Sequence, residues 1–96
     1  MKYLAELLKV LANEHRLQIL CELMESPKTV SVLGEKIPNI TQSALSQHLG
    51  LLKARGIVSD QRTGQNVTYR IADTRVESVI ATLKQTYCHP ETHVVD

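Results

Sequence analysis

Apolar side chains recur along the first part of the chain with the spacing of amphipathic helices. The first set predicts a helix from about residue 2 to residue 12. Its members, spaced i, i+3, i+4 and i+7, are Leu4, Leu7, Leu8 and Leu11. A second helix is predicted to begin after Asn13, a favourable N-cap, and to end at Pro27. Its apolar positions, which predict a buried stripe, are Leu17, Leu20, Cys21 and Met24.

Two further helices are predicted in the middle of the chain. Thr29 can cap a short helix that ends at Pro38. Its inward side chains are Val30, Leu33 and Ile37. Thr41 can cap a longer helix that runs to Ala54, with Gly56 as its natural C-cap. Its inward stripe consists of Leu45, Leu49 and Leu52.

The opposite face of this fourth helix is polar but carries no charge. It consists of Gln42, Ser43, Ser46, Gln47 and Gly50, with His48 at its edge. Exposed helix faces usually carry Lys and Glu, because both are soluble and good helix formers. Glutamine amides pair with adenine edges, and serine hydroxyls reach bases or phosphates. The pattern favours a surface that approaches DNA bases, and the alternative is an ordinary soluble surface.

After Gly56 the apolar spacing changes from the helical period to alternation, which predicts two strands. The first strand begins at residue 57, and the second carries alternating Val67, Tyr69 and Ile71. Residues 62–66 are predicted to form the basic turn of this hairpin. Asp73 then caps a last helix, which Pro90 ends. Its apolar stripe consists of Val76, Val79, Ile80, Leu83 and Tyr87.

This order of elements predicts a mainly α-helical protein with a small β-hairpin, the winged helix-turn-helix fold. We expect one DNA-binding and dimerisation domain over residues 1–89, followed by a C-terminal tail over residues 90–96. In such a fold the fourth helix enters the major groove as the recognition helix. The hairpin, or wing, reaches neighbouring phosphates.

The distribution of charge agrees with DNA as the partner. Between residues 36 and 70 the basic residues outnumber the acidic ones, since Asp60 is the only acid there. We therefore expect double-stranded DNA to be read by the fourth helix and held by basic side chains of the helix and wing. The predicted DNA-binding residues are Thr41, Gln42, Ser43, Ser46, Gln47, His48, Lys53, Arg62, Gln65 and Arg70.

The apolar stripes of the first and last helices have no obvious partners within so small a domain. They predict a two-fold homodimer, with a monomeric winged helix as the alternative. A symmetric dimer would present two recognition helices to an inverted-repeat operator. The predicted dimerisation residues are Leu4, Leu7, Leu8, Val76, Val79, Ile80, Leu83 and Tyr87.

Other classes of protein are not favoured. The chain has no apolar run long enough to span a membrane and no signal peptide pattern, so we expect a cytoplasmic protein without a membrane partner. It has no Cys-x-x-Cys motif and no recognisable phosphate-binding loop, so we expect neither an enzyme nor a cofactor. A winged helix used only for protein contacts is a further alternative, and it predicts no salt-dependent DNA binding.

Possible metal ligands gather at the end of the chain, where Cys88, His89, Glu91 and His93 follow closely. A metal site needs three or four convergent ligands, and Pro90 breaks the helix between them. The alternatives are a solvated tail with incidental histidines, or a metal-responsive site formed by Cys88, His89 and His93. Cys21 by itself is typical of a small core residue.

Three segments resemble the ArsR/SmtB family of dimeric bacterial winged-helix repressors. The three segments are LKVLANEHRLQILCEL, QSALSQHLGLLKARGIV and RTGQNVTYRI. The resemblance extends over nearly the whole chain. The cysteine of the first segment and the ending IATLKQTYC resemble a subgroup without a metal requirement, the BigR, YgaV and HlyU type.

The resemblance implies a role for both cysteines. In that subgroup two cysteines form a disulfide or polysulfide link that weakens DNA binding, and the matching residues are Cys21 and Cys88. The implied inducer is a small oxidant or a reactive sulfur species, and Lys84 or His89 can favour the Cys88 thiolate. The metal sites of the family have no match, because SVLGEKI lacks paired cysteines and VESVIATLKQTY lacks histidine. A metal-responsive repressor remains the alternative.

Overall fold

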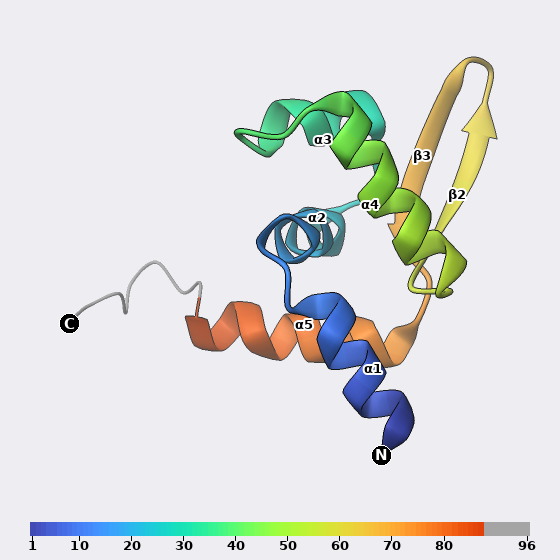
Figure 1. Cartoon of the computed structure of the whole chain (residues 1–96). Coiled ribbons are helices and arrows are strands. Elements are labelled where there is room, and N and C mark those ends of the chain that lie inside the picture. Colours follow the sequence, from blue (N-terminus) through green and yellow to red (C-terminus); the bar gives the residue numbers. More distant parts are fainter. Residues whose placement is uncertain (88–96) are drawn as a thin grey trace.

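The structure is a computed structural model and describes residues 1–87 (Figure 1). Five helices and a three-stranded antiparallel sheet make up this part of the chain. In chain order they are α1 (Lys2–Leu11), α2 (Glu14–Glu25), β1 (Lys28–Thr29), α3 (Val30–Lys36), α4 (Gln42–Ala54), β2 (Val58–Thr63), β3 (Asn66–Ile71) and α5 (Thr74–Tyr87). The predicted winged helix-turn-helix fold is confirmed.

Local hydrogen bonds fix where the helices begin, as the sequence predicts. The caps of α2, α3 and α4 each accept a bond from a backbone N–H two or three residues into the helix. The bonds run from Arg16 to Asn13, from Val32 to Thr29 and from Ala44 to Thr41, at 3.1, 3.2 and 3.0 Å. After α4 the chain turns at Gly56, whose φ of 73° suits glycine.

The sheet differs from the prediction in two respects. Its order is β1-β3-β2, and β1 was not predicted because two residues are too short to show alternation. The turn of the wing is also tighter than expected, since Thr63 already pairs with Asn66. Only Gly64 and Gln65 lie between the strands, and the φ of Gly64 is 62°. A glycine with positive φ at the first position is typical of a two-residue hairpin turn.

Helix α2 lies at the centre of the molecule, with α1 and α5 on one side and α3, α4 and the wing on the other (Figure 1). It contributes Ile19 and Leu20, both fully buried, to a core shared by all five helices. Three of the predicted dimerisation residues also belong to this core. Leu7, Val76 and Ile80 are buried within the single chain, so they offer no surface to a second copy.

The remaining apolar residues of α1 and α5 are accessible. Leu4, Leu8 and Tyr87 are 40%, 52% and 79% exposed, and Val79 and Leu83 are half-buried. These five residues are the accessible apolar side chains of the predicted dimerisation set and are called here the apolar surface of α1 and α5. None of the helices in residues 1–87 has the length and apolar character needed to cross a membrane.

Candidate nucleic-acid interface and cysteine site

Helix α4 turns its predicted polar face to solvent. Its inward side chains, Leu45, Leu49 and Leu52, are buried in the core, as expected. The exposed side chains of the helix include Gln42, Ser43, Ser46, Gln47 and Lys53. Because the buried stripe fixes the rotation of the helix, the uncharged amides and hydroxyls all project from one accessible face.

The wing lies beside α4 and presents its two predicted arginines on opposite faces. Arg62 lies opposite Val67 in the register of β2 and β3, whereas Arg70 lies opposite Ser59. Successive side chains of a strand point to alternate faces, so Arg62 shares the face of Asp60, which contacts α4. Arg70 is on the other face and donates to Gln61 Oε1 at 3.4 Å. Of the two, only Arg62 is on the recognition-helix side.

An ion pair joins the recognition helix to the wing. Lys53 Nζ of α4 lies 3.0 Å from Asp60 Oδ2 of β2. The Lys53 side chain is 54% exposed, so the pair contributes little to stability, on the order of 0.5 kcal/mol. Its effect is to neutralise part of the charge that Lys53 was predicted to offer to phosphate.

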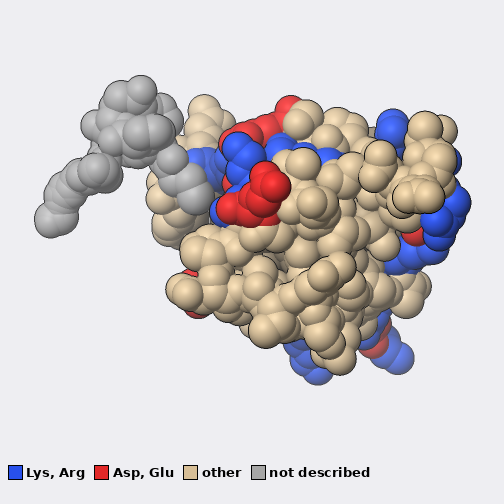
Figure 2. Space-filling view, turned by 90° about the horizontal axis from the view of Figure 1, so that it is seen from above, with Lys and Arg blue, Asp and Glu red and all other residues tan. Residues whose placement is uncertain are grey.

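The beginning of α4 and the turn of the wing border a shared groove. The groove has a volume of about 520 Å³ and lies between the beginnings of α3 and α4 and the turn of the wing. It brings together two predicted DNA-binding residues, Gln42 and Gln65, with Ser31 and Asn66. Figure 2 looks onto this side, where a broad central area has no charged side chains and Lys and Arg gather at the edge on the wing side.

His48 does not share the open face of α4. It is half-buried and turned toward α2, where Arg16 Nη1 lies 3.4 Å from His48 Nδ1. The ring of His15 is also near, with 5.9 Å between the two ring centroids. Burial, followed by the positive charge of Arg16, lowers the pKa of His48. Arg16 and His15 were missed from the sequence, because an arginine and a histidine on an amphipathic helix are typical of a solvated face.

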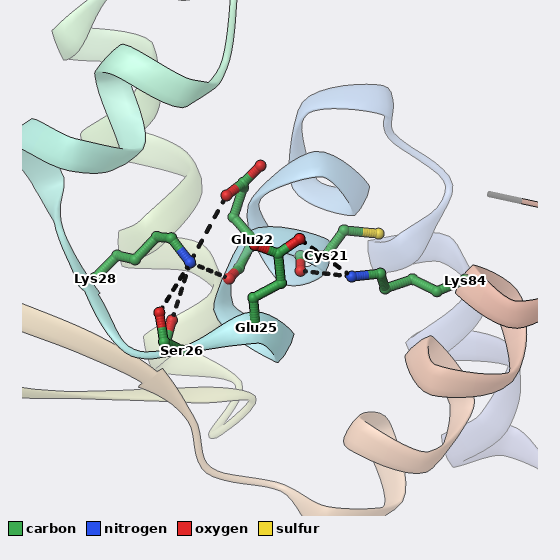
Figure 3. Close-up of polar contacts among 6 residues, drawn as sticks. All are labelled: Cys21, Glu22, Glu25, Ser26, Lys28 and Lys84. Atoms are coloured by element: carbon green, nitrogen blue, oxygen red, sulfur yellow. Dashed lines mark hydrogen bonds and ion pairs between the residues drawn. The ribbon is translucent and has the colours of Figure 1, made fainter. Parts of the chain in front are cut away.

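Cys21 lies on α2 next to the last turns of α5. It is half-buried and packs against the core. Lys84 Nζ of α5 donates to the Cys21 carbonyl oxygen at 3.5 Å and lies 3.6 Å from Glu25 Oε2. The sulfur of Cys21 points to the Lys84 side of α2 and away from Lys28 (Figure 3). The second predicted sensor residue, Cys88, lies outside the described residues.

A largely apolar groove gives access to Cys21. It has a volume of about 600 Å³ and runs between the start of α2 and the end of α3. Leu17, Cys21 and Ile37 line it together with Lys36. A small molecule can therefore reach this part of α2 from solvent.

The predicted metal ligands of the tail cannot be placed. Cys88, His89, Glu91 and His93 all lie outside the part of the chain that the structure describes. Within residues 1–87, no three His, Cys, Asp or Glu side chains come together in a way that would hold a metal ion.

Comparison with known proteins identifies the family. Residues 13–60 match the family described as bacterial regulatory protein, arsR family. The transcriptional activator HlyU of Vibrio cholerae is 43% identical over 82 residues, which are 85% of this chain and 75% of that protein. The HTH-type transcriptional regulator YgaV of Escherichia coli is 40% identical over 84 residues, 88% of this chain and 85% of that protein.

A solved structure agrees. The transcriptional repressor BigR from Xylella fastidiosa superposes with a TM-score of 0.83 at 32% identity, over 97% of this chain and 91% of that one. The relatives are named as regulators of transcription, and none of them as an enzyme. The chain therefore belongs to the ArsR family of bacterial regulatory proteins and is a transcriptional regulator.

Proposed function

We propose that the protein is a homodimeric repressor that binds an inverted-repeat operator, and that oxidation of Cys21 and Cys88 lowers its affinity for DNA. The observation that carries the DNA-binding part is the single exposed face of α4. This face combines Gln42, Ser43, Ser46 and Gln47 beside a wing with Arg62 on the same side. Amides and hydroxyls at this position suit base edges, and the arginine suits phosphate.

The apolar surface of α1 and α5 supports the dimer. Exposed Leu4, Leu8 and Tyr87 belong to α1 and α5, which lie on the other side of α2 from α4 and the wing (Figure 1). A two-fold contact through this surface leaves both recognition helices accessible. The half-sites are then expected about one helical turn apart, roughly 34 Å. A related winged helix-turn-helix DNA-binding domain from Mycobacterium bovis, 29% identical over 97% of this chain with a TM-score of 0.77, is described as homodimeric.

The position of Cys21 supports the redox part. Lys84 contacts the Cys21 carbonyl, and Cys88 follows Lys84 by four residues in the sequence. Oxidation removes two electrons and two protons from the pair of thiols. Hydrogen peroxide accepts them and becomes two molecules of water, and the two sulfur atoms join in a disulfide. An organic trisulfide can take the place of the peroxide. It then releases two thiols, and its remaining sulfur atom bridges the two cysteine sulfurs.

Such a link would act on DNA through the helices that it joins. Cys21 is on α2, which packs against α4, and Cys88 follows α5, which carries part of the proposed dimer surface. A covalent bond between them favours one arrangement of α5 on α2. A difference of about 1–3 kcal/mol between two such arrangements changes DNA affinity by roughly 5- to 150-fold.

The DNA-binding part is tested with duplexes that the reduced wild-type chain enriches from a random library. Gln47→Ala is expected to weaken binding by about 1–3 kcal/mol and to relax sequence preference, because the amide no longer meets a base edge. Gln85→Ala changes an exposed glutamine of α5, a helix on the other side of α2 from α4, and serves as the matched control. If no duplex is enriched, or if both variants bind as the wild type does, the proposal is wrong.

The redox part needs a separate measurement. Affinity for the selected duplex is compared before and after treatment with peroxide or an organic trisulfide, in the wild type and in the Cys21→Ser and Cys88→Ser variants. We expect the oxidant to weaken DNA binding by the wild-type chain only. Mass spectrometry of the oxidised wild type should find Cys21 and Cys88 linked. An equal loss of affinity in the serine variants contradicts the switch.

A further inference from the structure

One polar contact between α2 and the recognition helix has no part in the proposed function. Arg16 Nε donates to the Val10 carbonyl oxygen at 2.6 Å, and Arg16 Nη1 donates to His48 Nδ1 at 3.4 Å. The backbone N–H of the same residue donates to the cap Asn13. One side chain at the start of α2 thus holds the end of α1 and the middle of α4.

Each part of this contact has a chemical reason. The Val10 carbonyl is in the last turn of α1, where helix carbonyls lack partners within the helix. The guanidinium group carries only donors, so His48 Nδ1 must be the acceptor in the second bond. His48 is therefore neutral and carries its proton on Nε2. Protonation at Nδ1 removes the acceptor and places a second cation 3.4 Å from Arg16.

The surroundings of His48 favour its neutral form. The charged and titratable groups that face it are Arg16 and His15, both from α2. On β2, which packs on the other side of α4, Asp60 is turned to Lys53. The charged residues of α3, Glu35 and Lys36, are exposed. Within residues 1–87 no carboxylate forms an ion pair with His48, so a positive charge at this position has cations as its nearest neighbours.

We propose that Arg16 is a positioning residue for the recognition helix, and that protonation of His48 releases α4 from Arg16 and lowers DNA affinity. The proposal rests on the proposed DNA-binding function and adds a response to acid. α1 bears part of the apolar dimer surface, and α4 bears the recognition face. The Arg16–His48 contact therefore helps to set the angle between the two, on which the spacing of two recognition helices depends.

The direction of the pH response follows from the shift of His48. Its pKa lies below the ordinary value of histidine, so the neutral form and the contact are present at neutral pH and are lost as pH falls through the lowered value. Protonation of histidines adds positive charge, which by itself strengthens electrostatic attraction to the phosphates of DNA. A loss of affinity on acidification is opposite to that effect and is therefore diagnostic.

The test measures the affinity of the full chain for its selected duplex by fluorescence anisotropy between pH 7.5 and pH 5.5, at constant ionic strength. Each variant is normalised to its own value at pH 7.5. We expect the wild type to lose about five- to tenfold in affinity on acidification. His48→Gln keeps an acceptor that does not titrate, so its affinity is expected to stay level or to rise. His15→Gln is the matched control and should retain the loss.

Two further variants separate the contact from general stability. Arg16→Lys keeps the positive charge but loses the guanidinium group that donates to both Val10 and His48. We expect this variant to bind DNA more weakly at pH 7.5. Its circular dichroism spectrum should match that of the wild type. Arg16→Gln removes the cation beside His48. In an NMR titration, the pKa of His48 should then rise toward its ordinary value, whether or not DNA is present.

The outcomes are distinct. If no duplex is enriched from the library, the proposed function fails, and the NMR titration still tests the Arg16–His48 contact. If the wild type binds DNA more tightly at pH 5.5, or if His48→Gln shows the same loss as the wild type, the acid response is refuted. An unchanged pKa of His48 in Arg16→Gln refutes the contact itself.

Discussion

Asp73, which precedes α5, is expected to stabilise the fold in two separable ways. Its Oδ1 accepts from the backbone N–H of Arg75 at 2.9 Å, which is the bond of an N-cap. Its Oδ2 accepts from Arg75 Nη2 at 3.1 Å and from the hydroxyl of Tyr3 at 3.2 Å. The second set of bonds ties the beginning of α1 to the beginning of α5. Asp73→Ala removes both sets, whereas Asp73→Asn keeps a capping oxygen and removes only the charge.

The expected magnitudes follow from these contacts. Loss of an N-cap costs about 1 kcal/mol. The ion pair adds a smaller amount, because the Arg75 side chain is 71% exposed and solvent screens the pair. Asp73→Ala should therefore lower the free energy of unfolding by about 1 kcal/mol, most of it from the cap. In a domain of this size that corresponds to a fall in Tm of roughly 4 to 8 °C. Asp73→Asn should cost less than Asp73→Ala, because the capping oxygen remains.

The same carboxylate predicts a pH dependence. Hydrogen bonds from Arg75 are the main cause that lowers the pKa of Asp73 from 3.8 to about 2. Because the folded state favours the ionised form, the contribution of the charge is fully present above about pH 4 and is lost as pH falls through 2. The difference in stability between the wild type and Asp73→Asn should therefore shrink between pH 4 and pH 2.

Urea unfolding followed by circular dichroism, at one fixed protein concentration, measures these differences, since stability of a dimer depends on concentration. Glu77→Gln provides the control, because Glu77 is an exposed acid in the same first turn of α5. An equal deficit for Asp73→Asn at pH 2 and pH 5 would refute the role of the charge. Equal stability of Asp73→Ala and Asp73→Asn would refute the cap.

Three further outcomes are expected. Arg62→Ala should reduce the slope of log affinity against log salt concentration by about 1, and Arg70→Ala by less, because only Arg62 is on the α4 side of the wing. Leu8→Glu should convert the dimer to a monomer in analytical ultracentrifugation, whereas the same change at exposed Lys9 should leave the dimer intact. Leu52→Ala should lower the free energy of unfolding by about 2–5 kcal/mol in urea titrations, since Leu52 is 0% exposed and its loss leaves a cavity.

Local chemistry made much of the fold predictable. The capping side chains of Asn13, Thr29 and Thr41 bond to backbone groups three residues away. Their effect can therefore be predicted from the local sequence. Strand β1 was missed because its two residues are ordered by pairing with β3, which is forty residues away in the chain. The apolar stripes of α1 and α5 were recognised, but spacing alone did not tell which members face the core. Leu7, Val76 and Ile80 face the core, whereas Leu4 and Leu8 face solvent.

The features of the candidate site that depend on local spacing were also predictable, whereas those that depend on distant contacts were not. The exposed face of α4 follows from the helical period and its buried leucines, so it was predictable. The role of Arg16 was not, because its partners are a carbonyl of α1 and a histidine 32 residues away. The opposite orientation of Arg62 and Arg70 depends on the tight turn at Gly64, which the sequence placed too broadly.

Helix α2 is the element on which both proposed signals act. Arg16 in its first turn contacts α1 and α4, and Cys21 in its second half lies beside Lys84 of α5. The buried residues Ile19 and Leu20 lie between these two positions and fix α2 in the core, so that it moves as one body. A covalent bond at Cys21 would shift α5, and a proton at His48 would release α4. Both events would therefore change the angle between the dimer surface and the recognition face. Because both act on one equilibrium, oxidised protein should show a smaller further loss of DNA affinity on acidification than reduced protein.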